Sequence, residues 1–377
     1  MDFDLSDDQR LLKDSVDRLL ADRYGFEARN GFRREPEGWS RAVWAQFAEL
    51  GLLGLPFAEE HGGFGGGPVE TAIVMEAFGR ALVVEPYFAC VVLAGAVLRQ
   101  AATAEMLAEL VPQIAAGEKL LAYAGQERQA RWSVNDVQTR ATEGGGGWRV
   151  TGEKTLVLHG DTADAFVVTA RTEGEHRDRH GIGLFLLEAD AGGVTRRGYP
   201  AQDGTRAAEV SFADAPARLL RLDALERLEA ALDEAVAALC SEAVGTMDAM
   251  HAMTVDYLKT RKQFGRPIGD NQALQHRAVD MLVSLEQARS MAMFGTVMCR
   301  DPDPTDRQRA IHATRVQINN SGRHVGQEAV QLHGGIGVTM EYAVGHHFKR
   351  MSMIERQFGD TDTHLSALAR LGGLIAA

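Results

Sequence analysis

The sequence predicts an α+β protein of several domains: an N-terminal α-helical domain over residues 1–118, a middle antiparallel β-barrel domain over 119–222 and a C-terminal four-helix-bundle-like domain over 223–377. Three observations lead to this prediction. Apolar residues recur at helical spacing early in the chain, short β-rich runs alternate with turns in the middle, and long helical patterns return after Arg221. A chain of 377 residues also exceeds the usual size of a single core.

The first helix is expected to begin at Ser6, which with Gln9 has the form of a capping box ahead of a run of leucines and valines. Gly25 is expected to end this helix. Further helical patterns cover 39–50, 69–82, 88–98 and 104–116. The glycine-rich segment from Pro56 to Pro68 cannot continue a helix and is expected to be a loop.

The middle of the chain contains the β-rich runs LLAYAG, WRVTGEKTLVLHG, DAFVVTART, GIGLFLLEAD and AAEVSFAD. No helical pattern between them is long enough for a crossover connection. An antiparallel barrel or sandwich is therefore favoured over a parallel sheet.

Helical patterns then cover 224–262, 271–300, 305–333, 341–357 and 362–376. Their short spacers contain Gly or Pro, which predicts antiparallel neighbours in a bundle. The first of these helices is rich in Ala and Gly. Because small side chains let helices approach closely, this helix is expected to lie at the centre.

Composition excludes several classes of partner. The net charge of −12 argues against nucleic acid, which needs a clustered cationic surface. The longest apolar run, Tyr87 to Leu98, is too short for a bilayer, which takes about 20 residues. The start of the chain, MDFDLSDDQR, lacks the basic and apolar features of a secretory signal. Cys90, Cys240 and Cys299 lie in apolar surroundings and are expected to be buried structural thiols, which predicts a cytoplasmic protein.

A search for common cofactor motifs finds no GxGxxG after a strand, no Walker-type loop, no HExxH and no paired CxxC. The adjacent pair His346 and His347 faces different directions on a helix, which favours surface or interface roles over metal binding. A dinucleotide, if bound, must be held by something other than a Rossmann turn.

Three clusters of polar residues and glycines lie between apolar helices. In TRKQFGRPIGDNQALQH, Arg261 can neutralise a pyrophosphate and Phe264 can pack on an aromatic ring. In QLHGGIGVTMEY, Gly334 and Gly335 expose backbone amides. In FGDTDTH, Thr361 stands at the start of a helix, where anions bind readily. Each cluster alone also fits an ordinary helix cap.

Taken together with the layout, these strings resemble the acyl-CoA dehydrogenase family along essentially the whole chain. LSDDQRLLKDSVDRLL is similar to the family's first helix, and ELGLLGLPFAEEHGGFGG followed by EAFGR resembles its second pattern. WRVTGEKTLVLHGDTADAFVVTART looks like the family's β-domain hairpin. The strings YLKTRKQFGRPIGDNQALQH and QLHGGIGVTMEY are the most specific matches. Within the family, the chain looks most similar to the small subunit of pimeloyl-CoA dehydrogenase-like enzymes.

The resemblance implies an FAD cofactor, an acyl-CoA substrate, electron-transfer flavoprotein as electron acceptor, and a homo-oligomer or an α2β2 heterotetramer with a paralogous subunit. It implies FAD contacts across a dimer and within one subunit. Thr361 would contact the flavin of the same subunit, and the segments near Leu156, Leu158 and His159 would lie beside the isoalloxazine ring. The cross-dimer contacts would be Arg261, Gln263, Phe264, Gln331, Gly334 and Gly335.

The catalytic base is where the chain departs from the family. The usual glutamate precedes the last helix, but the matching position is Gly359, and Asp360 is the nearest acid. Asp360 is therefore the predicted base. The alternative is a base on a partner subunit, with Glu234 and Asp362 as weaker candidates. Glu234 adjoins Ala235, the position of the base in isovaleryl-type members.

Other departures affect the flavin site, because AGQERQARW replaces a β-domain signature, and Leu156 and Leu158 replace a flavin-stacking Trp and a flavin-bonding Thr. The implied function is FAD-dependent α,β-dehydrogenation of an acyl-CoA in fatty acid metabolism such as β-oxidation. Two alternatives stay open. One is a non-catalytic FAD-binding subunit of an α2β2 enzyme, and the other is a flavin oxidase or monooxygenase with the same fold.

Overall fold

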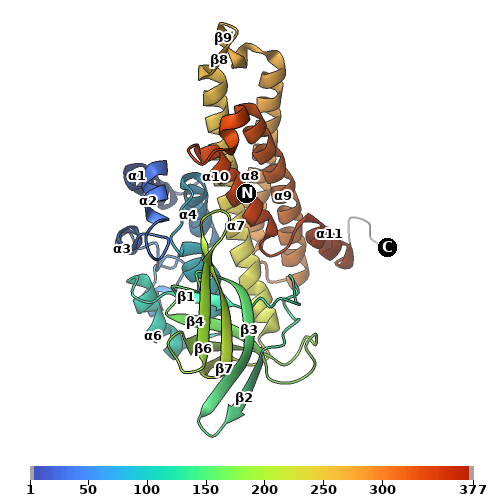
Figure 1. The fold of residues 1–377 in the computed structure, drawn as a ribbon. Coiled ribbons are helices and arrows are strands. Elements are labelled where there is room, and N and C mark those ends of the chain that lie inside the picture. Colours follow the sequence, from blue (N-terminus) through green and yellow to red (C-terminus); the bar gives the residue numbers. More distant parts are fainter. Residues whose placement is uncertain (1–3, 373–377) are drawn as a thin grey trace. The chain divides into compact units, whose positions relative to one another are not determined.

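The computed structural model describes residues 4–372 and has two compact units that are interleaved along the chain. The bundle unit comprises Met1–Asn30, Pro68–Val83 and Val236–Ala377. The β unit comprises Gly31–Gly67 and Val84–Ala235. Figure 1 labels the elements of both units and colours them by their position along the sequence.

The bundle unit contains long helices at the predicted places. They are α1 (Asp7–Arg23), α4 (Pro68–Ala81), most of α7 (Leu225–Thr260), α8 (Gln272–Met298), α9 (Pro304–His333), α10 (Ala343–Arg356) and α11 (Thr361–Arg370). The capping box is confirmed, because the Ser6 hydroxyl oxygen accepts the Gln9 backbone N–H and the Gln9 side-chain oxygen accepts the Ser6 backbone N–H. The predicted last helix ends at Arg370, and its final positions, 373–376, lie outside the described residues.

Shorter elements complete this unit. The short helix α2 (Phe26–Phe32), which the sequence patterns did not predict, follows α1. A hairpin of β8 (Lys262–Gln263) and β9 (Arg266–Pro267) and the 3-10 turn η3 (Ile268–Asp270) join α7 to α8. The 3-10 turn η4 (Gly334–Val338) follows α9. In Figure 1 the hairpin lies at the end of α7 and α8.

The β unit begins with helices and continues as a sheet. Its helices are α3 (Arg41–Glu49), α5 (Gly95–Ala101) and α6 (Ala104–Ala115), with the 3-10 turn η1 (Glu59–His61) in the predicted loop. The helix predicted over 88–98 is instead a π-helical segment, η2 (Phe88–Ala94), continued by α5. All residues of η2 are buried.

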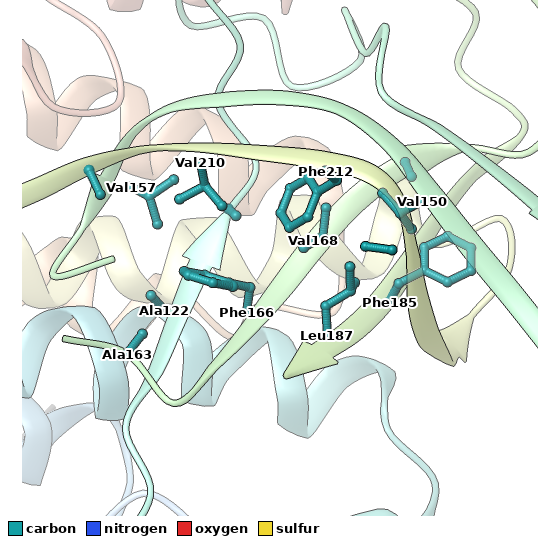
Figure 2. Close-up of a cluster of buried hydrophobic side chains, with 14 of the residues drawn as sticks. Ala122, Val150, Val157, Ala163, Phe166, Val168, Phe185, Leu187, Val210 and Phe212 are labelled. Carbon is teal, nitrogen blue, oxygen red and sulfur yellow. The ribbon is translucent and has the colours of Figure 1, made fainter. Parts of the chain in front are cut away.

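The sheet closes on itself. Its strands are β1 (Leu121–Ala124), β2 (Arg140–Gly144), β3 (Gly147–Leu158), β4 (Ala165–Arg171), β5 (Ile182–Glu188), β6 (Val194–Pro200) and β7 (Arg206–Arg221). The order β4-β2-β3-β7-β5 returns to β4, while β1 pairs with β4 and β6 with β7. Figure 2 shows the apolar interior, including Phe166, Phe185 and Phe212.

The strand directions differ in part from the antiparallel prediction. Most pairs are antiparallel, but β1 runs parallel to β4, and β2 meets β4 in parallel at a single pair, Arg140 and Arg171. The long path from β1 through the β2–β3 hairpin to β4 gives the chain room to return in the same direction. The barrel is therefore mixed.

The bundle unit is tightest where α4 crosses α7. A Cβ atom added at Gly79 would lie 2.0 Å from the carbonyl oxygen of Glu242, and one added at Gly245 would lie 1.9 Å from that of Glu76. The Thr246 hydroxyl also donates to the Gly79 carbonyl at 3.3 Å. Only glycine permits this backbone approach, so the close helix packing expected of the Ala- and Gly-rich helix is present at this crossing.

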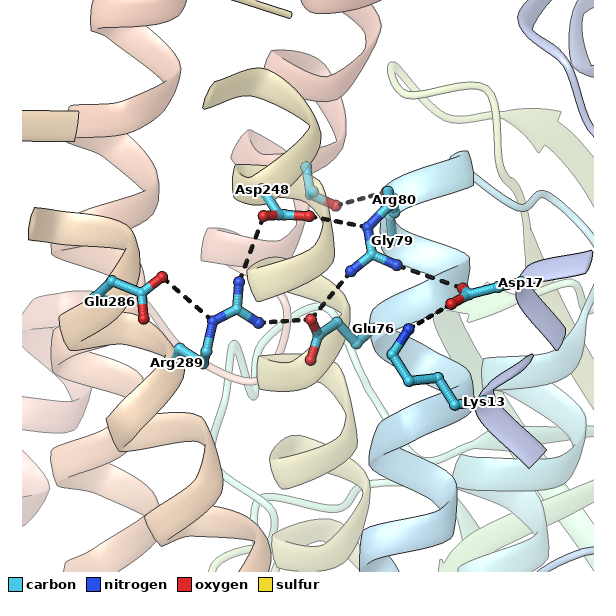
Figure 3. Close-up of polar contacts among 9 residues, drawn as sticks. Lys13, Asp17, Glu76, Gly79, Arg80, Asp248, Glu286 and Arg289 are labelled. Atoms are coloured by element: carbon cyan, nitrogen blue, oxygen red, sulfur yellow. Dashed lines mark hydrogen bonds and ion pairs between the residues drawn. The ribbon is translucent and has the colours of Figure 1, made fainter. Parts of the chain in front are cut away.

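Ion pairs surround this crossing, as Figure 3 shows. Arg80 donates to Asp248 at 2.9 Å and to Glu76 at 3.2 Å. Arg289 of α8 donates to the same Glu76 at 2.6 Å and lies 3.4 Å from Asp248. The Glu76-Ala-Phe-Gly79-Arg80 string thus serves helix packing in this protein.

Candidate flavin and catalytic site

Asp360, the predicted base, is the N-cap of α11. Its Oδ1 accepts the backbone N–H of Thr363 at 2.9 Å and the Thr363 hydroxyl at 2.6 Å. Hydrogen bonds from the Thr363 hydroxyl and backbone lower the pKa of the Asp360 carboxyl. A carboxylate with a lowered pKa is a weaker proton acceptor. The geometry is that of a helix cap.

Gly359 occupies the position that the sequence comparison assigns to the usual base. Its φ is +120°, which L side chains rarely adopt, and an added Cβ would lie 3.0 Å from Nε2 of His364 and 3.1 Å from Cγ2 of Thr363. This position therefore lacks a carboxylate, and its backbone conformation and close neighbours disfavour any side chain there.

Thr361 follows in the first turn of α11. Its hydroxyl oxygen is buried, yet it has no hydrogen-bond partner among residues 4–372, and the same holds for Oε1 of Gln357. A buried hydroxyl at a helix N-terminus needs an acceptor or donor to compensate its lost hydration. The local chemistry thus fits a polar ligand such as the ribityl–pyrophosphate part of FAD.

The predicted contacts Arg261, Gln263 and Phe264 lie on the β8–β9 hairpin and are exposed. Phe264 is 101% exposed and has a φ of +53°. A bulky residue with positive φ is uncommon, and a fully exposed phenyl ring buries no apolar surface in the isolated chain. Both features are expected of a side chain that packs against another molecule.

Gln331, Gly334 and Gly335 are also exposed and lie at the end of α9 and the start of η4. The neighbouring His333 stacks on Tyr257 of α7 with ring centroids 4.6 Å apart. Because Tyr257 is one turn before Arg261, the structure brings the two predicted groups to the same end of the bundle unit. Arg261 and the backbone amides of Gly334 and Gly335 can contact a pyrophosphate there, and Phe264 can pack on an aromatic ring.

Leu158 belongs to the β unit, at the end of β3. The β3–β7 register shifts between Lys154 and Val157, and Leu156 and His159 both have positive φ, +52° and +50°. This bulge turns Leu156 outward, where it is 47% exposed, while Leu158 is partly buried. Bulges of this kind re-aim side chains near functional sites.

The weaker candidates for the base are occupied or exposed. Glu234 forms an ion pair with Arg99, and both side chains are largely shielded from solvent. Asp362 is exposed on α11. Neither arrangement provides the dry, unpaired carboxylate that proton removal from carbon requires.

The histidine pair corrects a prediction. His346 and His347 are both buried in the bundle unit instead of facing its surface. The ring of His346 has polar partners there, since Arg29 contacts its Nδ1 and the Met340 carbonyl contacts its Nε2. Burial lowers the pKa of His347 to about 3. Within the described part of the chain, no group of His, Cys, Asp and Glu side chains could hold a metal ion.

The predicted buried thiols are confirmed. Cys90, Cys240 and Cys299 are free and buried, and burial raises the pKa of Cys90 to about 12 and that of Cys240 to about 11. Such thiols are poor nucleophiles at neutral pH. Over residues 4–372, no helix is long and apolar enough to cross a membrane.

Helices, a mixed β-barrel and further helices follow one another along the chain, with exposed polar residues and glycines at the β8–β9 hairpin and the α9–η4 junction. Family models match in chain order: acyl-CoA dehydrogenase N-terminal domain (residues 6–118), middle domain (122–215) and C-terminal domain (225–372). The chain belongs to the acyl-CoA dehydrogenase family.

Individual relatives agree with this assignment. The mouse mitochondrial long-chain specific acyl-CoA dehydrogenase is 30% identical, over 81% of this chain and 73% of that protein. PigA with FAD and proline has a TM-score of 0.88 at 25% identity, covering 98% of each chain. A variant of the Tcur3481-Tcur3483 steroid ACAD has a TM-score of 0.87 at 27% identity, covering 97% of each chain. The protein is an oxidoreductase of the acyl-CoA dehydrogenase type whose cofactor is FAD.

Proposed function

We propose that this chain binds FAD and takes part in the α,β-dehydrogenation of an acyl-CoA thioester, as one subunit of an α2β2 heteromer whose paralogous partner supplies the base. The observation that carries the heteromer proposal is the loop before α11. Gly359 has a positive φ and close side-chain neighbours that disfavour a side chain, and Asp360 is engaged as a helix cap. The two-part name of the Tcur3481-Tcur3483 steroid ACAD and the resemblance to pimeloyl-type small subunits support a companion chain.

The reaction makes a specific demand on the protein. A carboxylate must take the α-proton of the thioester while the β-carbon loses a hydride, so that a carbon–carbon double bond forms. FAD, when bound, accepts that hydride. We propose that electron-transfer flavoprotein then takes the electrons from the reduced cofactor. The carboxylate works best when burial raises its pKa, whereas the hydrogen bonds at Asp360 lower it.

The cofactor contacts that the family resemblance implies are kept in this proposal. We propose that Thr361 and Leu158 contact the flavin of their own subunit. The exposed hairpin and the α9–η4 junction contact the FAD of a neighbouring subunit. Those residues are Arg261, Gln263, Phe264, Gln331, Gly334 and Gly335. The three matched family regions also support domain limits near 1–118, 119–222 and 223–377.

The first test is the cofactor and its chemistry. The chain, purified with the product of any adjacent paralogous gene, is expected to be yellow and to bleach when butanoyl-, octanoyl- or hexadecanoyl-CoA is added without oxygen. Reoxidation by oxygen should be slow, since fast reoxidation with peroxide release would indicate an oxidase. Absorbance at the flavin bands measures both steps. A preparation that stays colourless after incubation with FAD would contradict the proposal.

The second test concerns the base. Asp360→Asn keeps an N-cap side chain and removes the charge, so turnover in the complete complex should stay within about twofold of the wild type. Asp360→Ala is the matched control and should lower stability by about 1 kcal/mol through loss of the cap. A loss of about 10³-fold in Asp360→Asn, with FAD still bound, would identify Asp360 as the base and reject the companion.

A further inference from the structure

Arg315 lies in the middle of α9 and is completely buried in the bundle unit. Its Nη2 donates to three backbone carbonyls, those of Ile354 at 2.9 Å, Gln357 at 2.8 Å and Gly359 at 3.2 Å. Its Nε lies 3.4 Å from Nε2 of His364. Among the described residues, none of its hydrogen-bond partners is a carboxylate.

This environment is unusual for a guanidinium. A buried charge is costly unless dipoles or nearby charges replace its water. Burial lowers the pKa of Arg315, and the Cys240 thiol and the Glu355 carboxylate offset this only in part. The last carbonyls of a helix supply such dipoles, since they form its negative end and have no partner within the helix. Arg315 therefore caps α10 from the side and binds the loop that follows it.

The loop is held at both ends. Arg315 fixes the carbonyl of Gly359, and the Asp360 side chain fixes the backbone of Thr363. Thr361, with its buried and unpartnered hydroxyl, lies between these two points. The imidazole of His364, which would meet a side chain at Gly359, fills the space on the remaining side.

We propose that Arg315 is a positioning residue of the flavin site, which sets the backbone of residues 357–360 and thereby aims the Thr361 hydroxyl at the cofactor. This inference rests on the proposed contact between Thr361 and FAD. A second buried atom of this loop, Oε1 of Gln357, also lacks a partner within residues 4–372. Two unpartnered polar atoms therefore lie on the segment that Arg315 holds. A lysine would keep the charge but lose the planar fork that reaches several carbonyls.

The test is FAD affinity, measured by titrating the apoprotein with FAD and following flavin fluorescence. Arg315→Lys should weaken binding about tenfold and Arg315→Met more strongly, because charged hydrogen bonds to the loop are lost. The matched control is Thr314→Val, the adjacent buried residue of α9, whose hydroxyl donates to Met291 of α8 at 3.1 Å and does not touch the loop. It should bind FAD within about twofold of the wild type.

A double-mutant cycle separates positioning from general destabilisation. Thr361→Val should weaken FAD binding in the wild-type background, but should add less than about twofold in the Arg315→Lys background, because the two residues act through one contact. Additive effects, or wild-type affinity in a folded Arg315→Lys protein, would overturn the inference. Failure of the wild-type protein itself to bind FAD would instead reject the proposed function. If Arg315→Met does not fold, the lysine variant decides.

Discussion

Gly245→Ala is expected to cause a large loss of stability in the bundle unit. The new methyl group would lie 1.9 Å from the carbonyl oxygen of Glu76 and 2.9 Å from the backbone nitrogen of Arg80, and neither backbone atom can move without displacing α4. Overpacking of this kind costs about 3 kcal/mol, which outweighs the gain of about 1 kcal/mol in helix propensity. The midpoint of thermal unfolding should fall by about 3–5 °C.

The control is Gly31→Ala, at a helical glycine of α2 where nothing lies within 4 Å of the added methyl group. This variant should be neutral or slightly stabilised. Gly79→Ala, which faces the same crossing from the other helix, should behave like Gly245→Ala. Circular dichroism during heating measures all three. Equal melting midpoints for Gly245→Ala and Gly31→Ala would show that the crossing can widen freely.

Gly245 and Asp360 differ in how far the sequence alone predicts their roles. Helix positions and the close packing of the Ala- and Gly-rich α7 follow from local periodicity and side-chain size, and the structure shows both. The role of Asp360 depends on competition between capping a helix and serving as a base. The pattern FGDTDTH contains both possibilities, and only the three-dimensional contacts with Thr363 favour one of them.

Buried polar residues were the hardest to predict. Arg315 and the His346–His347 pair occur in helical patterns where polar side chains usually face solvent, yet all are buried. Their partners come from distant positions, such as the carbonyl of Gly359 for Arg315. One signal was present: Arg315 shares the buried face of α9 with Ile311 and Ile318. Apolar periodicity alone passes over a charged residue on such a face.

Lys154 of β3, in the β unit, is another charged residue whose side chain is fully buried. Its Nζ donates to Glu127 at 2.7 Å and to the Thr169 hydroxyl at 2.9 Å. Glu127 has further donors, the backbone N–H groups of Gln138 at 2.8 Å and Thr139 at 3.0 Å. The glutamate would therefore keep hydrogen bonds without the lysine, whereas the buried lysine would lose the carboxylate that balances its charge.

Glu127→Gln is accordingly expected to destabilise the protein by about 3–5 kcal/mol, because an unpaired buried ammonium is left behind. Lys154→Met should cost clearly less. Lys119→Met is the control, since its partner Glu188 is 43% exposed and the pair should contribute at most about 1 kcal/mol. Urea unfolding at pH 7 measures the three midpoints. A smaller effect for Glu127→Gln than for Lys154→Met would contradict this asymmetry.

The pH dependence gives an independent check on Glu127. Burial alone would raise the pKa of this carboxyl, but attraction to Lys154 and hydrogen bonds from Lys154, Gln129 and Gln138 outweigh it and hold the pKa at about 2. A carboxyl with a lowered folded pKa stabilises the protein above its unfolded pKa, and that contribution is lost as the pH falls toward the folded value. The wild type should thus lose about 3 kcal/mol between pH 5 and pH 2 that Glu127→Gln does not lose. Parallel stability curves for the two proteins over this range would mean that the buried pair does not hold the carboxylate charged.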